Sequence, residues 1–184
     1  MSYAVTQLGI DDLEDVLVLF DTVQSWLVQK GLKGQWGDLP FSGSEAQRER
    51  FRRWLGSDRM VGLRLEGRVV GTSVFSPSPP GYAEEVMRGR TVGGYLEAFA
   101  VARDFAGRGV GAALIGWAEN EALSCGWATL YLDCWAGNAA LRAYYRRAGF
   151  AEIAPFAVGA WQGVLFQQTL KGALSPPATF LVKT

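Results

Sequence analysis

Apolar side chains recur every three or four residues between residues 11 and 30, with polar residues at the positions between them. Because this is the period of an α-helix, the pattern predicts a helix that buries one face in the core. The same period predicts three more helices: one that opens at Ser44, one over residues 111–124 and one over residues 138–148. Ser44 and Gln47, three residues apart, form a capping-box pattern at the start of the second helix.

Short runs rich in Val and Leu predict β-strands at residues 3–8, 60–66, 68–76, 93–101, 128–134, 150–153 and 164–170. The Glu66-Gly67 turn joins the second and third strands into a hairpin, and the helix over residues 111–124 is a crossover between strands. We therefore expect an α/β (α+β) fold with a mixed, mostly antiparallel central sheet flanked by helices. Residues 1–171 are expected to form a single domain and residues 172–184 a C-terminal tail.

Composition and charge narrow the class of protein. The 184 residues are 49% hydrophobic and 20% charged, which is typical of one soluble globular domain. Lys+Arg 18 balance Asp+Glu 18, so the net charge directs the molecule neither to nucleic acid nor to an anionic membrane. The chain has neither a basic leader followed by an apolar run nor a membrane-length apolar stretch, so we expect a cytoplasmic protein.

The chain has no histidine and two cysteines, Cys125 and Cys134. Catalysis by Ser-His-Asp or Cys-His arrangements is therefore excluded, and we expect no metal site. Two cysteines make no disulfide framework and fit a reducing compartment. Cys134 suggests an acyl-cysteine intermediate, but an apolar-flanked cysteine after a buried strand usually serves packing.

Three alternate glycines, Gly107, Gly109 and Gly111, lie where a strand leads into a helix. Such a turn leaves backbone N–H groups bare at a helix start, where the macrodipole favours a phosphate or pyrophosphate, although glycine turns also serve plain packing. A P-loop is excluded because no Gly-Lys-Ser/Thr follows. A dinucleotide fingerprint fits Gly107, Gly109 and Ala112, with Asp133 about 20 residues on, but only one strand-helix-strand unit follows.

A third interpretation explains more residues. The segments VARDFAGRGVGAAL and NAALRAYYRRAGF, separated by one helix and one strand, together resemble the GCN5-related N-acetyltransferase (GNAT) family. The family's phosphate motif, Arg/Gln-x-x-Gly-x-Gly/Ala, falls on Ala106, Gly109 and Gly111. Its later motif, an Asn followed by a helix ending Tyr-x-x-x-Gly-Phe, falls on Asn138, Tyr145, Gly149 and Phe150.

The resemblance implies a GNAT-like acyl-CoA N-acyltransferase fold with acetyl-CoA, or another acyl-CoA, as cofactor. Its pyrophosphate would lie on the N–H groups of residues 106–111, namely Ala106, Gly107, Arg108, Gly109, Val110 and Gly111. Ala106 departs from the motif's Arg or Gln, and Arg108 is the candidate compensating cation. In the family the preceding strand pairs with the cofactor's pantetheine arm, which implies contacts from Phe99, Ala100 and Val101, and a further one from Asn138.

Acyl transfer from a thioester to an amine needs a proton donor for the thiolate and a base for the amine. Tyr145 matches the family's tyrosine beside the thioester sulfur and is the candidate general acid; the alternative is a core tyrosine. Without histidine the base must be a carboxylate or a water chain, and Glu97 lies on the strand that reaches the cofactor. The alternative for Glu97 is an ion-paired strand glutamate.

The glycine-rich segment between the first two predicted helices carries Trp36 and Phe41, which either cover a pocket or tuck against the core. In the family, this segment and the one before the central strand wall the substrate pocket, so the resemblance implies that Trp36, Phe41 and Tyr82 are the candidate walls of the acceptor site.

We expect transfer of acetyl to a primary amine, in a small molecule or a peptide, by direct attack in a ternary complex. The alternative is a catalytically degenerate acyl-CoA-binding sensor or scaffold. The apolar Phe180-Leu181-Val182 could pair with a partner strand in a homodimer.

Overall fold

A computed structural model describes residues 3–57 and 59–171 of the chain. The predicted C-terminal tail, and with it Phe180-Leu181-Val182, lies outside these residues. The longer helices are α1 (Leu13–Gln29), α2 (Glu45–Gly56), α4 (Val110–Ser124) and α5 (Ala139–Arg147), with a short α3 (Glu84–Met87). The strands are β1 (Thr6–Gln7), β2 (Met60–Leu65), β3 (Arg68–Ser76), β4 (Gly94–Val101), β5 (Thr129–Trp135), β6 (Ala151–Val158) and β7 (Trp161–Thr169).

The strands form one seven-stranded sheet in the order β1-β2-β3-β4-β5-β7-β6. Only β4 and β5 are parallel; the other neighbouring pairs within the described ranges are antiparallel. The crossover between β4 and β5 runs through α4. The mixed, mostly antiparallel sheet is therefore confirmed, and the single parallel pair excludes a dinucleotide-binding fold.

The last hairpin is longer than the sequence pattern predicts. The sequence predicts strands at residues 150–153 and 164–170 with a bend near Gly159. The bend is present as a tight turn, in which Gly159 has φ +57°, but β6 and β7 both extend up to it. Pro155 interrupts the strand pattern, but it is tolerated because β6 is the edge of the sheet. At the opposite edge, β1 is shorter than the predicted strand over residues 3–8.

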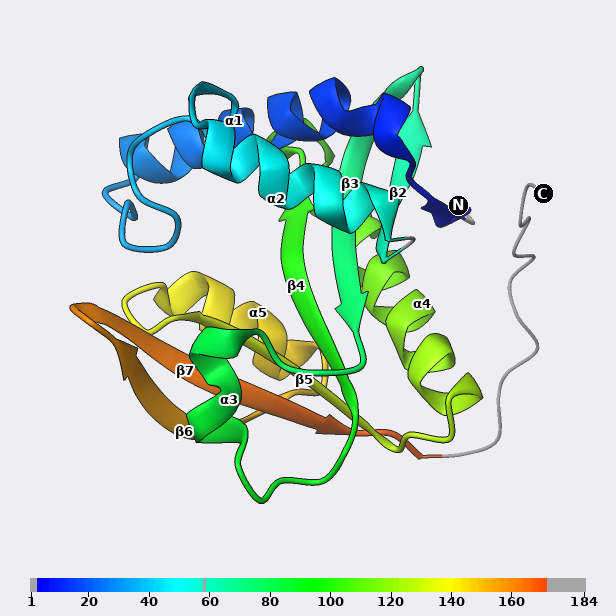
Figure 1. Cartoon of the computed structure of the whole chain (residues 1–184), viewed down its shortest axis with the longest axis vertical. Helices are drawn as coiled ribbons and strands as arrows, with labels where there is room; N and C mark the ends of the chain where they lie inside the picture. The colour runs from blue at the N-terminus through cyan, green and yellow to red at the C-terminus, as the bar shows by residue number, and fades with distance from the viewer. Residues whose placement is uncertain (1–2, 58, 172–184) are drawn as a thin grey trace.

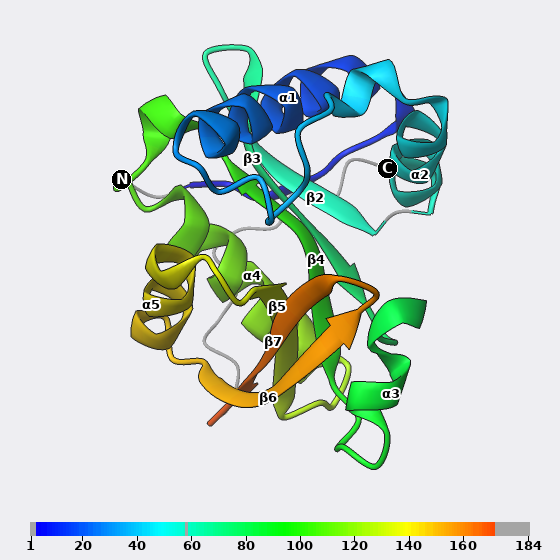
Figure 2. The same cartoon turned by 90° about the vertical axis from the view of Figure 1, so that its left-hand side faces the viewer.

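The helices divide the molecule into two ends. Figures 1 and 2 show α1 and α2 beside the β2–β4 end of the sheet, and α5 with β6 and β7 at the other end. Figure 2 also shows α3 on the opposite side of the sheet from α4 and α5. Each end has a hydrophobic core of its own: one lies beneath α1 and α2, and the other lies between α4, α5 and the second half of the sheet. The two cores flank the strands that separate at the site described below.

The amphipathic stripe of α1 is buried as predicted, with Val16, Leu17 and Phe20 at most 2% exposed. Phe20 packs edge-on against Phe51 of α2, with ring centroids 4.7 Å apart. Since such contacts bury large apolar surfaces, they fix the position of α2 over the sheet. Within the described residues, no helix is long and apolar enough to cross a membrane.

Candidate active site

The central feature of the sheet is a separation between β4 and β5. Their pairing runs from Gly94↔Leu130 to Leu96↔Leu132 and stops there. Beyond that rung β4 stays paired only with β3, as far as Val101, and β5 only with β7, as far as Trp135. Two strand edges that have no strand partner on this side therefore face each other, which is an arrangement suited to binding an extended polar chain.

The backbone of β4 is irregular where the strands separate. Ala98 has φ +48°, in the left-handed region that non-glycine residues rarely adopt. The β3–β4 register shifts at the same place, between Thr72↔Ala100 and Val74↔Glu97. This β-bulge turns the strand locally, as bulges near binding sites commonly do.

A cavity of about 300 Å³ opens where β4 and β5 separate. It brings together the predicted general acid, the predicted base and the predicted acceptor walls, together with one residue of the predicted cofactor strand: Tyr145, Glu97, Trp36, Phe41, Tyr82 and Phe99. The glycine loop and Asn138 do not line it. Strand register explains the convergence, because the rung at Leu96↔Leu132 puts Glu97 and Asp133 side by side on neighbouring strands.

Tyr145 enters the site from α5. Its side chain is 3% exposed, and its ring packs edge-on against Phe99, Phe150 and Phe166 at centroid distances of 5.5–6.2 Å. Burial raises the pKa of its hydroxyl well above the ordinary value. The hydroxyl therefore stays protonated at neutral pH and is available as a donor.

Glu97 enters the site from β4 with a side chain that is 9% exposed. Its Oε1 accepts a hydrogen bond from the Ser76 hydroxyl at 3.2 Å, and its Oε2 lies 3.7 Å from a guanidinium nitrogen of Arg50. Burial raises the pKa of the Glu97 carboxyl, and the Arg50 charge and the Ser76 hydrogen bond partly oppose that shift. Both alternatives for Glu97 therefore apply: it is paired with Arg50, and its pKa is raised toward the range that suits a general base.

Asp133, at the end of β5, is the second carboxylate of the cavity. Its Oδ2 accepts hydrogen bonds from the hydroxyls of Tyr95 at 2.6 Å and Tyr82 at 3.0 Å. Burial raises the pKa of Asp133, while the two tyrosine hydrogen bonds lower it. Sequence reasoning considered Asp133 only for a dinucleotide site; the available signal was its place at the end of a strand parallel to the one that carries Glu97.

The segment between α1 and α2 crosses the cavity and contacts the far end of the sheet. The Gly34 carbonyl accepts a hydrogen bond from Trp161 Nε1 at 2.8 Å, and Gln35 Oε1 accepts one from the Trp135 N–H at 3.3 Å. A Cβ at Gly34 would collide with the Trp135 indole, so this close approach requires glycine.

Trp36 in that segment packs against Phe20, at a centroid distance of 5.1 Å, and also lines the cavity. Phe41 also packs against Phe20, at a centroid distance of 5.2 Å, and also lines the cavity. The two alternatives for these aromatics, pocket wall and core packing, therefore both hold.

The glycine loop begins after Phe105 and ends at the start of α4. Gly107 and Gly109 have φ values of +77° and +86°, so both need the freedom of glycine. Gly109 is the N-cap of α4 and supplies no side-chain cap, which leaves the N–H groups of the first turn, over residues 109–112, free for a ligand. The Ala106 and Arg108 N–H groups instead donate within the loop, to the Arg103 and Phe105 carbonyls. The candidate phosphate-binding residues therefore include Ala112, one residue beyond the range 106–111 that the sequence predicts.

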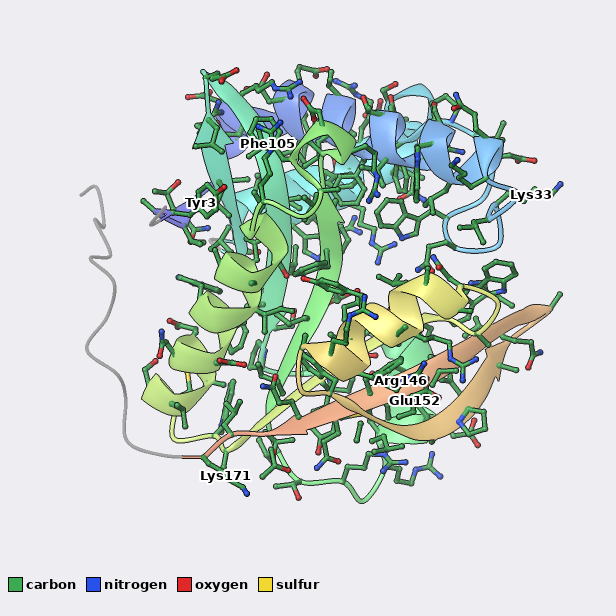
Figure 3. All side chains as sticks on the ribbon, turned by 180° about the vertical axis from the view of Figure 1, so that it is seen from behind. Tyr3, Lys33, Phe105, Arg146, Glu152 and Lys171 are labelled. Atoms are coloured by element: carbon green, nitrogen blue, oxygen red, sulfur yellow. The ribbon has the colours of Figure 1, made fainter. Side chains whose placement is uncertain are left out.

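Two side chains near this loop hold its shape. The Tyr3 hydroxyl donates to the Arg108 carbonyl at 2.7 Å, and Figure 3 shows Tyr3 beside the segment that leads from Phe105 into α4. The Arg108 guanidinium lies over the Phe105 ring, 5.0 Å from its centroid. The Arg108 side chain therefore packs on Phe105, and its role as a compensating cation for Ala106 stays a prediction.

We expect Gly109→Ala to raise the dissociation constant for acetyl-CoA about tenfold, because alanine lets the free loop relax out of the left-handed region, and returning it there on binding costs roughly 1–2 kcal/mol. Isothermal titration calorimetry measures the change. Gly126→Ala is the matched control, since Gly126 has φ +75° at the other end of α4. The control should lose stability but keep its affinity; equal affinities in the two variants would contradict a phosphate-binding role for the loop.

Asn138 is the N-cap of α5, and its Oδ1 accepts the Leu141 N–H at 3.1 Å. Asn138→Ala should lower the free energy of unfolding in urea by about 1 kcal/mol through the lost cap, and Asn138→Ser should restore most of it. The predicted cofactor contact requires that both variants weaken acetyl-CoA binding. If Asn138→Ser bound acetyl-CoA as tightly as the wild type, capping α5 would be the whole role of Asn138.

Cys134 is 1% exposed, and burial raises the pKa of its thiol to about 12. A thiol in this state is neither a good nucleophile nor accessible to an acyl donor. The packing interpretation of Cys134 therefore holds.

Comparisons with known proteins identify the family and the fold. The family model described as Acetyltransferase (GNAT) family matches residues 28–150. The Uncharacterized N-acetyltransferase YesJ of Bacillus subtilis (strain 168) is 40% identical over 65 residues, which cover 35% of this chain and only 36% of that protein.

Two solved structures are similar over most of their length. One is an acetyltransferase of the GNAT family from Listeria monocytogenes 4b F2365, with TM-score 0.70 and 21% identity over 91% of this chain and 95% of that one. The other is the ribosomal-protein-alanine N-acetyltransferase from Brucella melitensis, with TM-score 0.64 and 22% identity over 90% and 99%. At these identities, both demonstrate a shared fold.

Proposed function

The chain belongs to the acetyltransferase (GNAT) family, and we propose on that premise that it transfers an acyl group, most simply acetyl, from acyl-CoA to a primary amine. The observation that carries the proposal is the cavity at the end of the Leu96↔Leu132 rung, which Tyr145, Glu97 and Asp133 line together. An acid and two carboxylates around one opening between strands suit a reaction that takes one proton from an amine and gives one to a thiolate.

The residues around the opening fit an acyl-CoA. Its pyrophosphate would lie on the free N–H groups at the start of α4, where the helix dipole favours an anion. Its extended arm would pair with backbone groups of β4 over residues 99–101, which have no partner on β5. Bound there, acyl-CoA supplies a thioester carbonyl that is activated toward amines.

The chain's own groups then handle the protons. The acceptor enters as an ammonium and first gives one proton to the Glu97 carboxylate, directly or through one water. The neutral amine then forms the new C–N bond, and the second proton that its nitrogen loses replaces the one that Tyr145 gives up. Tyr145 donates a hydrogen bond or a proton to the sulfur as the C–S bond breaks, so that CoA leaves as the thiol. Within the described residues, the cavity offers no exposed cysteine for an acyl-enzyme, which supports direct attack in a ternary complex.

Two assays test the proposal. Acetyl-CoA and CoA should stabilise the protein against heat in proportion to their binding, whereas NAD should not. Free-thiol release should then require an added amine. Stabilisation by NAD alone would refute the assignment. Stabilisation by acetyl-CoA with no thiol release across an amine panel, above hydrolysis, would refute transferase activity.

A further inference from the structure

The cavity contains an unbalanced charge. Its charged lining residues are Glu97, Asp133 and Arg50. Arg50 is already engaged, since it pairs with Glu97 and its guanidinium lies 4.4 Å from the centroid of the Trp54 ring. Within the described ranges, Asp133 makes no ion pair, and its hydrogen bonds come from two neutral tyrosines. One carboxylate is therefore left without a cation, in a site where burial disfavours an uncompensated charge.

Nearly half of the residues that line the cavity are aromatic. Nine of its nineteen lining residues are Phe, Trp or Tyr, and they come from the α1–α2 segment, α2, β4, α5 and β7 among others. Trp36, Trp54 and Trp161 contribute indole rings from three different segments. Rings of this kind offer flat apolar surfaces to another ring and favourable faces to a cation. At about 300 Å³ the cavity lies at the small end of ligand sites.

We propose that the acceptor is a small aryl-alkyl primary amine that carries no carboxylate, bound with its ammonium group between Glu97 and Asp133 and its ring among the aromatic walls. The proposal rests on the proposed function for the reaction, but the binding step can be measured by itself. One ammonium balances the charge of the cavity. A carboxylate next to the amine would add a second uncompensated negative charge, and a polycation would exceed the one charge to be balanced.

Tryptophan fluorescence measures this binding, because three indoles line the cavity. 2-Phenylethylamine should bind saturably and at least about tenfold more tightly than L-phenylalanine, which differs by its carboxylate, or n-propylamine, which lacks the ring. Asp133→Asn should weaken 2-phenylethylamine about tenfold and leave the neutral 2-phenylethanol unchanged. The substitution keeps an oxygen that can accept from Tyr82 and Tyr95. Asp104→Asn, at an exposed acid paired with Arg68, is the control and should change neither affinity.

Equal or tighter binding of L-phenylalanine, or an unchanged affinity for 2-phenylethylamine in Asp133→Asn, would overturn the proposed acceptor class. Thiol release separates this outcome from a failure of the proposed function. Fastest release with L-phenylalanine, or with a peptide that begins with alanine, would keep the transferase and refute the acceptor class. Selective, Asp133-dependent binding of 2-phenylethylamine without thiol release from any amine would keep the ligand class and refute the transferase.

Discussion

Tyr145→Phe should lower kcat about 100-fold and leave the dissociation constant for acetyl-CoA unchanged, because the variant loses only the hydroxyl that donates to the leaving sulfur. The aromatic ring would keep its packing against Phe99, Phe150 and Phe166, so the fold should be preserved. Initial rates of thiol release give kcat, and calorimetry gives the affinity.

Tyr144→Phe is the matched control for this variant. Tyr144 precedes Tyr145 on α5, and its hydroxyl lies beside Gly111 rather than in the lining of the cavity. We expect Tyr144→Phe to keep its kcat. Wild-type turnover in Tyr145→Phe would remove Tyr145 as the acid, and equal losses in both variants would indicate a general effect on α5.

Glu97→Gln should lower kcat/KM for the amine about 100-fold near neutral pH, because glutamine cannot accept the proton that the attacking amine releases. The amide would still accept the Ser76 hydrogen bond, so the side chain should stay in place. In the wild type, the base is active when ionised, so kcat/KM rises with pH through the pKa of Glu97. Burial raises that pKa, so the acid limb should lie above the ordinary value of 4.5.

Ser76→Ala provides the control for that assignment. The Ser76 hydrogen bond stabilises the charged form of Glu97 and lowers its pKa, so its removal should move the acid limb to still higher pH. The plateau above the limb should change little, because the carboxylate remains. An acid limb that Ser76→Ala leaves in place, or that persists in Glu97→Gln, would assign the titration to another group.

Local patterns predict most of the elements, because helix period and strand composition act within a few residues. The stripe over residues 11–30 and the Glu66-Gly67 hairpin are both present in the structure. The predicted end of β6 at residue 153 is wrong. Pro155 breaks the local strand pattern, but pairing with β7 continues the strand as far as Val158. Such pairing depends on a neighbour and cannot be seen in one segment.

The candidate site divides in the same way. The glycine loop is predictable because φ > 0 and a helix start are properties of consecutive residues. Asp133 is not, because its partnership with Glu97 arises from the register of two parallel strands and from where that register ends. The contact between the α1–α2 segment and Trp161 also joins residues far apart in the sequence. Its one local signal is the glycine content of that segment.

Initial rates of thiol release, measured while acetyl-CoA and the best amine of the panel are both varied, test direct transfer at this cavity. Direct attack in a ternary complex predicts double-reciprocal lines that intersect. Parallel lines would indicate that CoA leaves before the amine binds, through an acyl-enzyme, and would contradict the account.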